Sequence, residues 1–162
     1  MRFSTGSAAA DSRDDFARAR RQGQRSRAAG RLLGRPEEVD ILVPFDEVIA
    51  ALGRRGERRL GLVPIAVDTI VGSVDRLRGF DRRFRPTSEL SRARFERIAQ
   101  IVRSGGDLPP IDVYRVGEAH FVRDGHHRVA VARAMGWSTI DAYVTEILTE
   151  VGASRDLTVA DL

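Results

Sequence analysis

The strongest constraint on the fold is the stretch at 60–147, in which apolar strand patterns alternate with helical ones. Residues 62–67 and 69–71 are apolar and rich in β-branched side chains, which favour strands. Residues 95–102 place apolar side chains at i, i+3, i+4 and i+7, the spacing of a helix that buries one face. This alternation predicts an α/β (α+β) fold rather than an all-helical or all-strand one.

Two strands joined by a tight turn are expected after that helix. The strands cover 111–116 and 119–123, and Gly117-Glu118 between them is typical of a hairpin turn. A helix is predicted over 126–135, and a last strand over 139–147. The expected architecture is a small mixed sheet with flanking helices.

Differences in composition divide the rest of the chain into an N-terminal segment, a short helix with a linker, and a C-terminal tail. Residues 1–38 are rich in Arg and Ala and poor in large apolar side chains, which predicts an N-terminal arm or a marginal helix. Residues 39–59 predict a short helix followed by a linker, with 54–59 as a solvated loop. The predicted core is 60–148, and residues 149–162 are expected to form a polar C-terminal tail.

The charge and the absent residue types restrict the function. All 27 basic residues are Arg, and Lys and Asn are both missing, which is typical of GC-rich codon usage and weakens any inference from charge alone to nucleic acid. With no Cys, the chain has no disulfides, no thiolate metal sites and no thiol catalysis. No apolar run approaches about 20 residues and no signal peptide is evident, so a cytoplasmic location without a membrane span is expected.

The pentapeptide Asp124-Gly125-His126-His127-Arg128 joins an expected strand to an expected helix and carries the clearest chemistry. A helix N-terminus has unpaired N–H groups and a partial positive charge, and a preceding Gly lets the backbone approach a ligand closely. The turn therefore predicts a phosphate site. Arg128 could bind phosphate oxygens, His126 and His127 could donate to them or move protons, and Asp124 could bind magnesium or hold a His.

Other interpretations of this turn stay open. Asp-Gly after a strand is also an ordinary turn, Asp is an ordinary helix cap, and His127 shares a helical face with apolar residues, as a core side chain would. A zinc site from His120, His126, His127 and Asp124 is a weaker alternative, because adjacent His on a helix point about 100° apart. We therefore assign no residues to a metal site that the chain would form by itself, without a nucleotide.

The segment from 62 to 147 resembles the ParB/sulfiredoxin superfamily. The resemblance rests on residues 63–65 (Val-Pro-Ile), 108–114 (Leu-Pro-Pro-Ile-Asp-Val-Tyr) and 121–128 (Phe-Val-Arg-Asp-Gly-His-His-Arg), in the order and spacing of that superfamily. It implies a ParB/sulfiredoxin-like fold and a phosphate site at the helix start.

Details of the turn distinguish the branches of the superfamily. Sulfiredoxins resemble it with Gly-Gly-Cys-His-Arg, and because His126 stands at the Cys position, reduction of a sulfinylated peroxiredoxin is excluded. Chromosome-partitioning proteins carry Gly-Glu-Arg-Arg-x-Arg, of which Gly125 and Arg128 match while His126, His127 and Ala130 differ.

The turn is most similar to that of the ADP-dependent free serine kinases, Asp-Gly-His-Thr-Arg. Asp124, Gly125, His126 and Arg128 match that motif, and His127 replaces the Thr. The similarity is confined to one short motif and leaves the substrate open.

A second candidate cluster lies in the loop at 75–85, where members of the superfamily place residues that face the nucleotide. Asp75 or Asp81 could act as a base or a magnesium ligand, and Arg78 or Arg83 could hold phosphates. The alternative is a surface loop with scattered ion pairs.

These observations predict a protein that binds a nucleoside di- or triphosphate with magnesium. The corresponding enzyme would be a nucleotide-dependent hydrolase or a small-molecule kinase, with His126, Asp124 and Asp75 as catalytic residues and Gly125, His126, His127, Arg128 and Arg78 on the nucleotide. The alternative is a non-enzymatic, DNA-associated ParB-like regulator that uses the Arg-rich segments.

Overall fold

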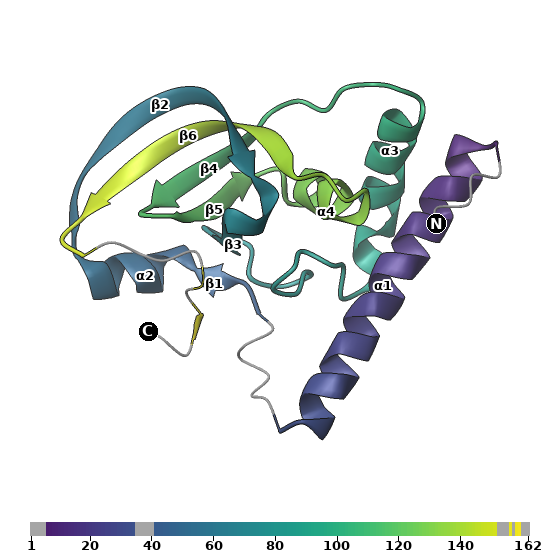
Figure 1. The fold of residues 1–162 in the computed structure, drawn as a ribbon, viewed down its shortest axis with the longest axis horizontal. Helices are drawn as coiled ribbons and strands as arrows, with labels where there is room; N and C mark the ends of the chain where they lie inside the picture. Colours follow the sequence, from purple (N-terminus) through teal and green to yellow (C-terminus); the bar gives the residue numbers. More distant parts are fainter. Residues whose placement is uncertain (1–5, 35–40, 152–155, 157, 160–162) are drawn as a thin grey trace.

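A six-stranded mixed sheet with the strand order β1-β3-β5-β4-β6-β2 forms the centre of the molecule (Figure 1). The computed structural model describes residues 6–34, 41–151, 156 and 158–159. The strands are β1 Val43–Pro44, β2 Arg54–Ala66, β3 Ile70–Ser73, β4 Ile111–Val116, β5 Ala119–Asp124 and β6 Thr139–Thr149. The α-helices are α1 Ala8–Leu32, α2 Phe45–Leu52, α3 Arg92–Arg103 and α4 His126–Ala134, and short 3-10 turns η2 and η3 cover Val67–Thr69 and Glu89–Ser91. The expected mixed α/β fold is confirmed.

The strand directions explain where the loops meet. β1, β3 and β5 are mutually parallel neighbours, whereas β4 pairs antiparallel with β5 through the hairpin expected at Gly117-Glu118. On its other side β4 is parallel to β6, and β6 pairs antiparallel with β2. The carboxyl ends of β1, β3 and β5 therefore share one edge of the sheet.

Helices cover both faces of the sheet. α3 and α4 pack on one face, where Phe95 and Ala99 of α3 are fully buried as their spacing predicts. The buried side chains of β6 at 140, 142 and 144 belong to the same cluster. α2 covers part of the opposite face through Phe45 and Val48. These two apolar clusters hold β3 and β5 between them, which fixes the edge where their loops begin.

The N-terminal region is a docked helix over residues 8–32, which is the helical one of the two alternatives that we predicted for it, and residues 1–5 and 35–38 lie outside the described residues. α1 is 25 residues long, and Phe16 is completely buried with its ring edge-on to Phe95 at 5.5 Å. Asp15 accepts two hydrogen bonds from Arg103 of α3, at 2.7 and 2.8 Å. The apolar stripe is thin because a buried ion pair supplies part of the contact.

Residues 54–59 are not the solvated loop that their composition predicts. They form the first half of β2 and pair antiparallel with residues 145–149, the last part of β6. β2 is an edge strand, so charged side chains can remain in solvent while the backbone pairs. Arg58 adds an ion pair to Glu146 of β6 at 2.5 Å. In the described part of the chain no helix is long and apolar enough to cross a membrane.

Candidate functional site

The candidate site lies where the parallel strands β1, β3 and β5 end. Pro44 is in register with Ser73, and Ser73 with Val122, so the segments that follow these strands leave the sheet side by side. They are α2, the loop at 74–88 and α4. In open α/β sheets ligands bind in the crevice outside the carboxyl ends of such strands, so this edge is the first place to look for a site.

Two helices begin at this edge, and only one is suited to an anion. α2 carries Asp46 and Glu47 in its first turn, which already neutralise its positive end. α4 has no acidic residue in its first turn, and its N-cap is Gly125, which offers no side-chain acceptor to the first N–H groups. The positive end of α4 is therefore available to an external acceptor.

Gly125 is required by the backbone as well as by the site. Its φ of 106° lies in the left-handed region, which other residues rarely adopt. A Cβ at this position would lie 2.6 Å from Cγ2 of Ile111. The turn into α4 is thus built for glycine, as the sequence motif suggests.

His126 is held against the end of β3. Its Nε2 lies 2.7 Å from Oγ of Ser73, and the same Oγ accepts a hydrogen bond of 2.9 Å from the backbone N–H of Arg76. The hydroxyl of Ser73 also lies 3.4 Å from the carbonyl oxygen of Val122, to which it can donate. These contacts hold the ring of His126 in place at the start of α4.

Two aromatic rings of the 74–88 loop enclose the histidines. Phe80 and Phe84 are both buried, with ring centroids 6.2 Å from that of His126. Phe80 also meets His127 edge-on at 5.1 Å. The loop therefore shields the histidine rings from water on one side.

Burial and nearby cations keep both histidines uncharged near neutral pH. Burial, followed by the charge of Arg76, lowers the pKa of His126 to about 4. Burial, followed by Arg76 and Arg94 of α3, lowers the pKa of His127 to about 4 as well. An anion at the start of α4 would offset this positive potential, so the same groups that suppress the charge of the histidines favour anion binding.

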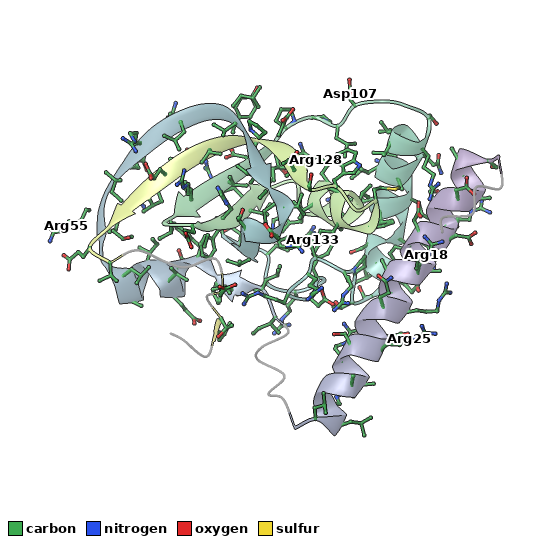
Figure 2. All side chains as sticks on the ribbon, in the orientation of Figure 1. Arg18, Arg25, Arg55, Asp107, Arg128 and Arg133 are labelled. Atoms are coloured by element: carbon green, nitrogen blue, oxygen red, sulfur yellow. The ribbon has the colours of Figure 1, made fainter. Side chains whose placement is uncertain are left out.

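The side chain of Arg128 does not point to the unpaired N–H groups at the start of α4 but binds three oxygen atoms of the protein. Its Nη1 donates to the carbonyl oxygens of Pro109 and Pro110, at 2.9 and 2.6 Å, and its Nη2 donates to Asp124 Oδ2 at 2.8 Å. It ties the entry of β4 to the start of α4 (Figure 2 labels its position). The structure thus gives Arg128 and Asp124 a positioning contact, whereas we predicted direct ligand contacts for them.

The loop residues of the second candidate cluster divide into two kinds. Asp75 and Arg78 are exposed, and the carboxylate of Asp75 acts electrostatically on His126. Asp81 is 2% exposed and binds the backbone N–H groups of Arg83 and Arg85, so it organises the loop and is not available as a base or metal ligand. Among the described residues no group of three or more His, Asp or Glu is arranged to hold a metal ion.

Sequence reasoning missed Ser73 and Arg94 as neighbours of the histidines, and it placed Arg76 in the candidate loop at 75–85 without giving it a role at the nucleotide. Ser73 ends a short apolar strand, and only the parallel pairing of β3 with β5 brings it to His126. No local pattern signals that pairing. The alternative in which His127 packs as a buried side chain agrees with its burial, because it is 8% exposed.

The fold and the site define a mixed α/β domain with an open helix N-terminus beside parallel strand ends. Residues 69–158 match the ParB N-terminal domain, so the chain belongs to this family. Among solved structures the chain is similar to the crystal structure of sulfiredoxin from Arabidopsis thaliana, with 21% identity over 51% of this chain and 82% of that one and a TM-score of 0.33. No curated protein matches the chain.

Proposed function

We propose that this ParB-like protein binds a nucleoside di- or triphosphate with magnesium, its phosphates at the N-terminus of α4. One observation carries the proposal: the first turn of α4 has no capping side chain and no acidic residue, and the charges of Arg76 and Arg94 act on its two histidines. A helix N-terminus with cations beside it is a general way to bind phosphate.

Each residue of the site has a distinct proposed role. Gly125 and the N–H groups of the first turn would bind the phosphate oxygens, with His127 and His126 as neutral donors behind them. Arg128 would keep the turn in place through Pro109 and Pro110.

Phosphoryl hydrolysis or transfer is the finer part of the proposal. Asp75, exposed and near His126, is the carboxylate best placed to hold magnesium or accept a proton, and Asp124 is the second. Exposed Arg78 in the same loop would contact the nucleotide from the solvent side.

Arg76→Gln and Arg94→Gln should each weaken nucleotide binding about tenfold, because each removes one cation from the phosphate site. Calorimetric titration of ADP, ATP, CTP and GTP with magnesium measures this directly. Arg76 and Arg94 side chains are exposed, so neither change should unfold the protein.

Arg97→Gln is the matched control, since Arg97 is an exposed arginine on the same helix as Arg94. Its nucleotide affinity should equal that of the wild type. An equal loss of nucleotide affinity in Arg97→Gln and Arg94→Gln would mean that only the net charge of the protein matters and that Arg94 does not contact the phosphates. Failure of the folded wild type to bind any of the four nucleotides at about 1 mM would overturn the proposal.

A second candidate function, DNA association, is favoured by α1. Arg21 and Arg25 are exposed on this helix, whose C-terminal half extends beyond the rest of the domain (Figures 1 and 2). A projecting basic helix can contact phosphates along a duplex.

The double change Arg21→Gln, Arg25→Gln should weaken DNA binding and lower the slope of log K against log salt by about 2, one for each lost phosphate contact. Fluorescence anisotropy of a labelled duplex at several salt concentrations measures this slope. Salt-independent binding, or none by the wild type, would exclude this candidate.

A further inference from the structure

A cavity lies at the other end of α4 from the candidate site, between this helix, α1 and η2. Its volume is about 570 Å³, which is within the range of small-molecule sites. α1 contributes Ala19 and Gln22, and the loop at 74–88 contributes Arg83 and Arg85. The cavity does not share a lining residue with the turn at 124–128.

Arg133 is the unusual residue of this cavity. Its Nη2 donates to the carbonyl oxygens of Val67 and Ile70, at 2.9 and 3.1 Å. Its Nε is buried without a hydrogen-bond partner, and no carboxylate of the described residues forms an ion pair with it. A guanidinium stays charged at any physiological pH, so this charge is partly desolvated and has no carboxylate in direct contact, although the charges of Asp68 and Asp81 act on it from further away.

The surroundings add to the positive potential. Burial, followed by the charge of Arg83, lowers the pKa of Arg133. Arg85 is already paired with Asp81 at 2.7 Å, whereas Arg83 is exposed at the rim of the cavity. Asp68 is the one carboxylate among the lining residues. An anion in the cavity would therefore meet two cations that it could pair with, Arg133 and Arg83.

Part of the lining is apolar. Ala130 and Ala134 of α4 and the ring of Trp137 line the cavity, together with Ala19. A bare inorganic ion would fill only part of such a volume and would leave this wall uncovered. The chemistry of the cavity thus fits a molecule with an oxyanion at one end and an apolar or aromatic group at the other.

We propose that this cavity is a binding site for a small organic oxyanion, with Arg133 and Arg83 on the charged group and Ala134 and Trp137 on the apolar group. It is a different site from the start of α4. Arg128 and Arg133 are five residues apart, which places them about 140° apart around the helix axis (Figure 2 labels both).

Phenyl phosphate is a suitable probe, and Trp137 supplies the signal because it is the single Trp of the chain. Phenyl phosphate should change Trp137 fluorescence saturably in the full-length protein, and phenol, which lacks the charge, should not. Arg83→Gln should weaken the apparent affinity about tenfold through loss of one charged contact. Arg133→Gln should abolish the response.

Because Arg133→Gln also removes the bonds to Val67 and Ile70, exposed Arg83 is the decisive position. Arg97→Gln, which changes an exposed arginine that does not line this cavity, should leave the affinity unchanged. Arg76→Gln should also leave it unchanged, which separates this site from the nucleotide site. No saturable response up to about 10 mM, or a loss in Arg76→Gln equal to that in Arg83→Gln, would overturn the proposal.

Discussion

Replacing Asp81 by Ala should lower the free energy of unfolding by about 3–5 kcal/mol, the range for breaking a buried ion pair from one side. Asp81 Oδ1 accepts the backbone N–H groups of Arg83 and Arg85, at 2.9 and 3.0 Å. Its Oδ2 accepts Nε of Arg85 at 2.7 Å and lies 3.7 Å from Arg27 of α1. The substitution leaves two amides and the Arg85 guanidinium without their acceptor, and it removes the ion-pair partner of Arg27.

The loss of order in the loop at 74–88 should also weaken the proposed nucleotide site. Phe84 has a φ of 56°, a conformation that costs free energy and that the carboxylate of Asp81 helps to hold, since the loop N–H groups on both sides of Phe84 bind it. Phe84 and Phe80 both contact His126. Nucleotide affinity should therefore fall in Asp81→Ala even where the protein remains folded.

Urea denaturation measures the change, and Asp75→Ala is the control. Asp75 is an exposed carboxylate of the same loop, so its removal should change the free energy of unfolding by no more than about 0.5 kcal/mol. Equal midpoints for Asp81→Ala and the wild type would mean that the carboxylate does not organise the loop.

The core of the fold was predictable because its signals are local. The hairpin at Gly117-Glu118 and the helix beginning at His126 depend on short-range turn chemistry and on spacing, and both are confirmed. The packing of α1 against the rest of the domain was not predictable, for a different reason. Its docking depends on Arg103, more than 80 residues away, and on a close approach at Gly23, whose missing Cβ admits Asp81 Oδ2.

The candidate site was predictable only where its residues are adjacent in the sequence. The Asp124-Gly125-His126 turn stands in the motif itself, and the structure places it at the strand end as expected. Ser73 was missed, and Arg76 was not assigned to the turn, because both reach it only through the parallel pairing of β3 with β5. β4 lies between these two strands in the sequence. Periodicity carries no information on strand order, so these residues need the sheet to be known.

Acidification from pH 7.5 to 5 should destabilise the protein by several kcal/mol. The pKa of each of His120, His126 and His127 is lowered to about 4, with burial as the main cause. In the unfolded chain these groups titrate near 6.5, so below that pH the unfolded state binds more protons than the native one and gains stability. The loss amounts to about 1–2 kcal/mol for each histidine at pH 5 and continues until the pH reaches the folded pKa.

Urea midpoints at pH 7.5, 6 and 5 measure this dependence in a window that lies above the ordinary pKa of carboxylates. His127→Gln should show about two thirds of the pH dependence of the wild type, because glutamine does not titrate. A flat profile between pH 7.5 and 5 would show that the histidines are not held neutral.

The same titration bears on the nucleotide site. A phosphate bound at the start of α4 places negative charge beside His126 and His127, which favours their protonated forms and raises their pKa. His120 lies on β5, where Thr69 and the charge of Arg115 surround it, so its titration should not respond. Imidazole NMR signals in the presence and absence of nucleotide would therefore move for two histidines and stay fixed for the third.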